Sequence, residues 1–180
     1  MTGDPASLAG AYTTESTPAG PVRAGRPEDA AEVVRLRRVM FAAMTGTDAP
    51  GPWEGEARRL LAAELAGPDP TTGVFVVDAA GGVGLASCAV GTVERRLPSP
   101  SSPAGLFGFV FNVCTDPAHR GRGYARATTE ALLDWFAARG VTRVDLHATP
   151  EAEHLYRELG FAAHSTALSL DVSARAGARS

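Results

Sequence analysis

The segment with the clearest chemical potential is Val113-Cys-Thr-Asp-Pro-Ala-His-Arg-Gly-Arg-Gly-Tyr-Ala-Arg126. An apolar strand pattern ends at Thr115, and a loop with two glycines then opens directly into a helical pattern. The start of a helix has free N–H groups that bind anions, and the two glycines leave room for a phosphate beside the backbone. Three arginines add positive charge at the same point: Arg120, Arg122 and Arg126. We therefore predict an anion site suited to a pyrophosphate.

Two other glycine-rich phosphate loops do not fit this segment. All 17 basic residues of the chain are arginines. A P-loop lysine is therefore absent, and so is any lysine for Schiff-base or cofactor aldimine chemistry. The dinucleotide fingerprint G-x-G-x-x-G, started at Gly121, fails because its sixth position is Arg126. A plain tight turn between strand and helix remains an alternative interpretation.

The rest of the chain must position this loop. Helical spacing of apolar residues predicts helices over 27–44, 53–66, 124–139 and 151–159. Runs of β-branched and aromatic residues predict strands over 74–77, 83–93, 106–115, 141–147 and 165–172. Hairpins followed by β-α-β units indicate an α/β fold, with a mixed, mostly antiparallel sheet, helices on both faces and the order ααβββαβαβ. We expect a single domain over 22–172, with a mobile tail at 1–21 and a second tail at 173–180.

Two motifs carry a resemblance to a known family. The first, Arg120-Gly-Arg-Gly-Tyr-Ala125, matches an acyl-CoA pyrophosphate loop written Arg/Gln-x-x-Gly-x-Gly/Ala. The second, His154-Leu-Tyr-Arg-Glu-Leu-Gly-Phe161, resembles a helix end written Leu-Tyr-x-x-Leu-Gly-Phe. On these motifs and on the order of its elements, the chain resembles the GNAT acetyltransferase superfamily over residues 22–172.

The resemblance implies a role for each part of this region. Main-chain groups of Val113, Cys114 and Thr115 would contact the pantetheine arm of acetyl-CoA, where strands 109–115 and 142–147 splay apart. Tyr156 would be the general acid that protonates the departing CoA thiolate, which suits a phenol with a pKa of ~10. The pyrophosphate would lie on Arg120, Gly121, Arg122, Gly123, Tyr124, Ala125 and Arg126.

The chain departs from the family pattern at two points. Thr149 stands where many members carry an asparagine that contacts the pantetheine arm, and residues 97–115 contain no acid that could be a catalytic glutamate. The general base is therefore His147 or a chain of water molecules. The first helices of the family build the acceptor end, and four of their side chains are candidates here: Arg37, Arg38, Trp53 and Glu56.

The function implied by the resemblance is transfer of an acetyl group from acetyl-CoA to a primary amine of a small molecule or peptide. The amine would attack directly, with Tyr156 as the acid. Two alternatives stay open: a non-catalytic acyl-CoA-binding sensor or regulatory module, and a different nucleotide-binding protein. Turnover with an amine, binding without turnover, and equal affinity for ATP and CoA would distinguish the three.

Composition narrows the expected partners and location. The net charge of -3 argues against nucleic acid or an anionic membrane as partner, and no apolar stretch is long enough to span a bilayer. Cys88 and Cys114 lie in apolar runs, so we expect buried core residues and no metal site. No secretory signal precedes the domain, which favours a cytoplasmic protein. Analogy with the family leaves a homodimer open.

Overall fold

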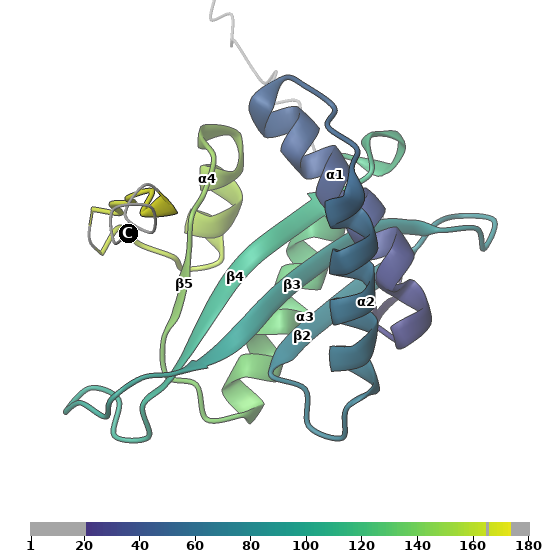
Figure 1. Cartoon of the computed structure of the whole chain (residues 1–180). Helices are drawn as coiled ribbons and strands as arrows, with labels where there is room; N and C mark the ends of the chain where they lie inside the picture. Colours follow the sequence, from purple (N-terminus) through teal and green to yellow (C-terminus); the bar gives the residue numbers. More distant parts are fainter. Residues whose placement is uncertain (1–20, 165, 174–180) are drawn as a thin grey trace, which may run out of the picture.

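The computed structural model describes residues 21–164 and 166–173, which form a five-stranded sheet covered by helices (Figure 1). The strands lie side by side in chain order: β1 (Val22–Ala24), β2 (Thr72–Asp78), β3 (Leu85–Arg95), β4 (Leu106–Thr115) and β5 (Val144–Leu146). Strands β1 to β4 are antiparallel, and β5 runs parallel to β4. The mixed, mostly antiparallel sheet predicted from the sequence is confirmed.

Two helices cover one face of the sheet. A 3-10 turn, η1 (Pro27–Asp29), leads into α1 (Ala30–Thr45), and α2 (Pro52–Ala66) follows. Val33 and Leu36 of α1 are buried against sheet residues that include Val76 and Val90, and Leu61 of α2 packs on the same cluster. This spacing of apolar residues along the helices is the pattern by which the sequence predicted them.

The opposite face is covered by α3 (Tyr124–Ala138), which follows the short turn η2 (Pro117–His119). Phe136 of α3 is fully buried, and its ring lies so close to the sheet that a Cβ on Gly91 would come within 2.8 Å of it. The last helix, α4 (Pro150–Glu158), follows β5. Helices therefore lie on both faces, as the sequence predicted.

An irregularity in β4 decides which side chains face α1. Val90 lies opposite Asn112 and Gly91 lies opposite Val110, so Phe111 has no partner on β3 and forms a bulge. The bulge breaks the strict alternation of faces, because Val110 packs on the α3 side whereas Phe111 and Asn112 both contact Arg37 of α1. Two adjacent residues of β4 are thereby presented to the same helix.

The parallel pairing of β4 and β5 is short. It runs from Gly108 opposite Val144 to Val110 opposite Leu146, and residues 111–115 of β4 have no partner on β5. In Figure 1 the two strands diverge beyond this point, with α4 beside the end of β5. The open edge of β4 fits the slot expected from the sequence.

The predicted last strand over 165–172 is wrong for the part that can be checked. Ser165 lies outside the described residues, and residues 166–172 pair with no strand. Leu168, Leu170 and Val172 alternate along the chain, yet they are 91%, 70% and 57% exposed. Alternation indicates which face a strand would bury, but a strand also needs a neighbouring edge to pair with. The edge strand β5 is only three residues long.

The other differences from the predictions are smaller. The strand predicted over 141–147 is reduced to β5, and β1 was not predicted because three residues carry too short a pattern. The tails predicted at 1–21 and 173–180 lie outside the described residues, apart from Pro21 and Ser173. None of the helices within 21–164 and 166–173 is long and apolar enough to cross a membrane.

Candidate active site

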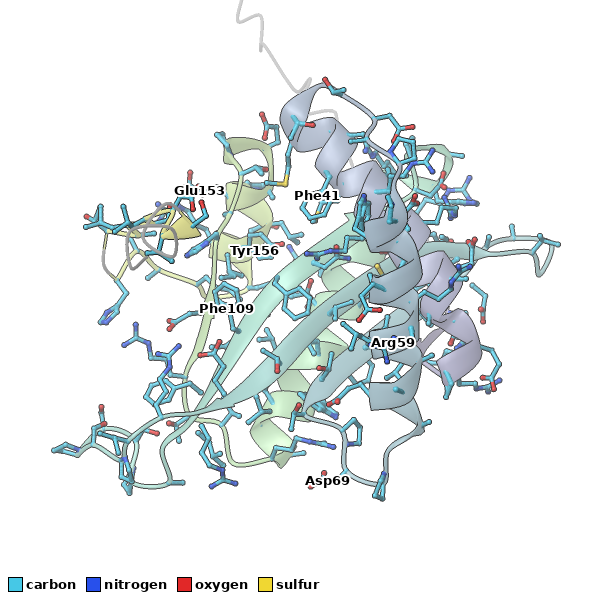
Figure 2. The ribbon with its side chains drawn as sticks, viewed as in Figure 1. Phe41, Arg59, Asp69, Phe109, Glu153 and Tyr156 are labelled. Carbon is cyan, nitrogen blue, oxygen red and sulfur yellow. The ribbon has the colours of Figure 1, made fainter. Side chains whose placement is uncertain are left out.

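A cavity of about 650 Å³ lies where β4 parts from β5, bordered by α1, α4 and the loop before α3. Figure 2 shows Phe41 of α1, Phe109 of β4 and Tyr156 of α4 around this space. The cavity brings together the residues that the sequence assigned to acetyl-CoA and to acid catalysis, which come from three separate segments. They are Val113, Cys114, Thr115, Arg120, Gly121, Arg122, Gly123, Tyr124, Ala125, Arg126 and Tyr156.

The backbone of β4 turns alternate residues toward the cavity. Asp116 donates its N–H to the carbonyl of Ala86 at 2.8 Å, so the even-numbered residues at this end of β4 bond to β3. The N–H and C=O groups of Val113 and Thr115 therefore point to the open edge. The Thr115 carbonyl indeed accepts from Nε of Arg120 at 3.5 Å. Cys114 turns its carbonyl to the Ser87 hydroxyl on β3, which narrows the predicted main-chain contacts to Val113 and Thr115.

The loop before α3 is shaped to receive an anion. Gly121 and Gly123 have φ angles of 74° and 76°, a left-handed conformation that glycine adopts without strain. A Cβ built on either glycine meets no protein atom within 4 Å, so the space above the loop is free. The first backbone bond of α3 runs from the N–H of Ala127 to the carbonyl of Gly123. The N–H groups before it are left for a ligand.

The three arginines of the loop are not equivalent. Arg120 and Arg122 are exposed, and neither forms an ion pair within the described residues. Arg126 is half-buried and pairs with Glu158 of α4, which also lines the cavity, and more distantly with Glu130 at 3.8 Å. The free positive charge of the loop therefore resides on Arg120 and Arg122.

An ion-pair cluster ties the start of this loop to α1. Arg35 donates to the carboxylate of Asp116 at 2.7 Å, to Glu32 at 3.0 Å and to the carbonyl of Leu85 at 2.9 Å. Asp116 also accepts the N–H of Ala118 at 3.0 Å, which begins η2. The Arg35 guanidinium and this N–H hold the pKa of Asp116 below its ordinary value. The loop is thus anchored to the helix that forms the opposite wall.

Tyr156 is the most buried ionisable group of the cavity after Cys114, with 9% of its surface exposed. Its ring packs edge-on against Phe161, with 5.8 Å between ring centroids. Burial raises the pKa of its phenol above the ordinary value of 10.0. The hydroxyl is therefore protonated throughout the physiological pH range.

The cavity offers few groups that could accept a proton. His147 is exposed at its margin, edge-on to Phe109 with ring centroids 5.4 Å apart. Thr149 caps α4 through its carbonyl, which accepts from the N–H of Ala152 at 3.0 Å. Among the described residues that line the cavity, Glu158 is the one acid, and Arg126 occupies it.

The four acceptor-end candidates from the sequence do not line this cavity. Arg38 pairs with Asp48 at 2.7 Å, Glu56 pairs with Arg59 at 2.6 Å, and Trp53 packs edge-on against Phe41. Arg37 instead lines a smaller adjoining cavity of about 370 Å³ between α1, α2 and the sheet. Sequence reasoning missed the residues shared by both cavities, Phe111 and Asn112, because a bulge leaves no local pattern.

The two cysteines are buried, as the sequence predicted, and both are free. Cys88 and Cys114 lie directly opposite each other on β3 and β4. Burial raises the pKa of both thiols, to about 11 for Cys114. No group of three His, Cys, Asp or Glu side chains that could hold a metal occurs within 21–164 and 166–173.

Comparison with known proteins decides the family. Residues 38–161 match the acetyltransferase (GNAT) family. The chain belongs to this family. A mycothiol acetyltransferase of Beutenbergia cavernae is 40% identical over 62 residues, 33% of this chain, and the match spans only about a fifth (21%) of that relative. Glucosamine 6-phosphate N-acetyltransferase 1 of Oryza sativa subsp. japonica is 30% identical over 119 residues, 66% of this chain and 70% of the relative.

Solved structures share the GNAT fold. A predicted acetyltransferase from Clostridium acetobutylicum, crystallised with acetyl-CoA, superposes with a TM-score of 0.73 at 19% identity, over 84% of this chain and 96% of that one. A GCN5-related N-acetyltransferase from Ralstonia eutropha gives 0.70 at 25% identity, over 85% and 99% of the two chains. Glucosamine-6-phosphate N-acetyltransferase from Arabidopsis thaliana gives 0.66 at 18% identity, over 84% and 97%.

Proposed function

We propose that the protein transfers an acetyl group from acetyl-CoA to a primary amine of a small molecule or peptide, with Tyr156 as general acid. The observation that carries this proposal is the cavity. It joins the open edge of β4, the glycine loop before α3 and a buried phenol on α4. Membership of the acetyltransferase family supports the same conclusion.

The residues present fit acetyl-CoA. Its pyrophosphate would lie on the loop, held by the free N–H groups at the start of α3 and by Arg120 and Arg122. Its pantetheine arm would bond to the cavity-facing main-chain groups of Val113 and Thr115 in the manner of an added strand. When bound, acetyl-CoA supplies the acetyl group as a thioester. A neutral amine can attack the thioester carbonyl, so that an amide forms and the thiol of CoA is released.

The chain's own residues would assist at two atoms. The N–H of Val113 would polarise the acetyl carbonyl oxygen as it gains negative charge. The hydroxyl of Tyr156 would give its proton to the leaving sulfur, since burial keeps the phenol protonated. The attacking nitrogen must lose a proton in turn, and His147 or water at the cavity margin would receive it. Solvent would then restore the proton of Tyr156.

One observation favours a second function, a non-catalytic acyl-CoA-binding module. The described cavity residues include one acid, Glu158, and its ion pair with Arg126 leaves no free carboxylate for a base. A protein of this kind would bind acetyl-CoA tightly and acetylate no amine. Its acyl-CoA site would be the same, so only turnover separates the two functions.

A steady-state assay of CoA release against a panel of amines tests the proposal, with mass spectrometry of the acetylated product. We expect turnover with at least one amine. Acetyl-CoA binding without release of CoA in the presence of any amine would contradict it and favour the binding module. Calorimetry with acetyl-CoA and with ATP on the same preparation checks that the loop is selective for CoA.

A further inference from the structure

Arg37 of α1 differs from every other half-buried arginine among the described residues. Six others each have a carboxylate partner: Arg23, Arg35, Arg38, Arg126, Arg139 and Arg143. Arg37 has none within 21–164 and 166–173, and burial lowers the pKa of its guanidinium. A positive charge taken partly out of water without a counter-ion costs free energy. Such a cost suggests a partner that the protein itself does not supply.

The contacts of Arg37 fix its guanidinium without neutralising it. It donates to the side-chain oxygen of Asn112 at 3.3 Å, and it lies 4.6 Å from the ring centroid of Phe41 and 5.6 Å from that of Phe111. Asn112 is itself buried and donates to the thiol of Cys88 at 3.4 Å. Aromatic faces orient the planar guanidinium and leave N–H groups at its edge available.

Arg37 lies beside the residues that the two cavities share. Phe41 lines the larger cavity, Arg37 lines the smaller one, and Phe111 and Asn112 line both. The acid at the smaller cavity, Glu64, forms no ion pair with Arg37, and its Oε1 accepts the N–H groups of Thr71 and Thr72 at 2.6 and 3.1 Å. A ligand that extends from the thioester slot past the two phenylalanines would therefore reach Arg37.

We infer that Arg37 binds an anionic group of the acceptor, so that the substrate is an amine carrying a carboxylate or a phosphate. The inference rests on the proposed function and narrows it to a substrate class. Arginine suits this role because its forked donors match the oxygens of either anion. Arg35, two residues earlier on the same helix, cannot take it, because two carboxylates already neutralise it.

The test compares amines in pairs that differ in the anion. One pair is 4-aminobutyrate and butylamine, and the other is glucosamine 6-phosphate and glucosamine. We expect the wild type to prefer the anionic member of at least one pair in kcat/KM, and Arg37→Gln to reduce this preference by about 10- to 100-fold. Arg37→Lys, which keeps the charge but loses the fork, should retain part of it. The pair that responds identifies the anion as carboxylate or phosphate.

Arg139→Gln is the matched control. Arg139 also lies over an aromatic ring, 4.0 Å from the centroid of Trp135, but it pairs with Asp69 and lies at the end of α3 away from both cavities. Its removal should leave the preference unchanged. Thermal unfolding distinguishes a binding role of Arg37 from a purely structural role. Arg37→Gln should keep or raise Tm, since it removes an unneutralised charge, whereas a clear fall in Tm would indicate a structural arginine.

A binding measurement decides the inference if none of the four amines is acetylated. Inorganic phosphate and acetate are titrated by calorimetry into CoA-saturated protein, so that the pyrophosphate loop is occupied. Anion binding that is at least tenfold weaker in Arg37→Gln than in Arg139→Gln supports the inference, even if the proposed acetyl transfer fails. Equal acetylation of neutral and anionic amines, or anion binding unaffected by Arg37→Gln, overturns it while the proposed function stands.

Discussion

The loop before α3 and the α1 surface around Arg37 both present arginines to ligand space, but they are built differently. In the loop, left-handed glycines and free N–H groups provide the site, and its unpaired arginines are exposed. Around Arg37, side chains from α1 and β4 meet across the sheet face, and the charge is half-buried between aromatic rings. The first arrangement suits the pyrophosphate of the proposed co-substrate acetyl-CoA, which is the same in every reaction. The second suits a group that differs from one amine acceptor to another.

This difference predicts which changes affect every acceptor and which affect only some. Tyr156→Phe removes only the hydroxyl, so we expect kcat to fall by about 100-fold or more for all amines alike. The affinity for acetyl-CoA and the preference between paired amines should not change. Rapid-quench measurement of acetyl transfer, together with calorimetry, checks both parts. An unchanged rate would remove Tyr156 from the mechanism, and a changed amine preference would place it at the acceptor end.

Loss of the ion pair between Asp116 and Arg35, which joins the loop to α1, should have a smaller effect. Asp116→Asn weakens the contact with Arg35 and should lower the free energy of unfolding by about 1 kcal/mol, a modest value because both partners are partly exposed. Because the pKa of Asp116 is lowered in the folded state, this contribution is present above about pH 4 and is lost as the pH falls below it. Urea unfolding of both proteins at pH 7 and pH 3 measures the difference. A difference of equal size at both pH values would contradict the ion-pair explanation.

The last prediction concerns the two thiols, which take no part in the proposed reaction. Burial raises the pKa of Cys88 and Cys114, so native protein should react with a disulfide reagent at pH 8 far more slowly than unfolded protein. Absorbance should report two thiols per chain only after addition of guanidinium chloride. Fast labelling of one thiol in the native protein, slowed by acetyl-CoA, would show instead that the thiol of Cys114 is reactive from the cavity that this residue lines.

The two regions also differ in how far the sequence predicts them. The residues 120–126 form a continuous motif whose conformation depends on its own glycines, so the loop and the helix after it could be predicted. Asn112 and Arg37 are 75 positions apart, and Phe111 reaches them only because the register between β3 and β4 shifts. A register shift depends on both strands at once, and neither strand carries a signal of it alone.

The helices and strands of the fold show the same limit. Helices and central strands were predictable because their apolar side chains recur at a regular spacing on the side that packs, as Leu132 and Phe136 do in α3. The alternation at Leu168, Leu170 and Val172 predicted a strand wrongly, because pairing depends on an edge that lies elsewhere in the chain. Local periodicity was therefore reliable where burial was local, and failed at the margin of the sheet.

The most direct test of the account is calorimetric titration of acetyl-CoA into wild type, Gly123→Asp and Gly140→Asp. Aspartate tolerates the left-handed backbone better than most residues, and both glycines have positive φ angles, of 76° and 74°. The two variants therefore carry the same charge and similar strain, but only position 123 lies in the cavity. We predict that Gly123→Asp weakens acetyl-CoA binding by at least about 100-fold, because its carboxylate occupies the space of a phosphate and repels the phosphate charge. Gly140→Asp should bind acetyl-CoA like the wild type. Equal binding by all three proteins would contradict the placement of the pyrophosphate on this loop, and with it the proposed function.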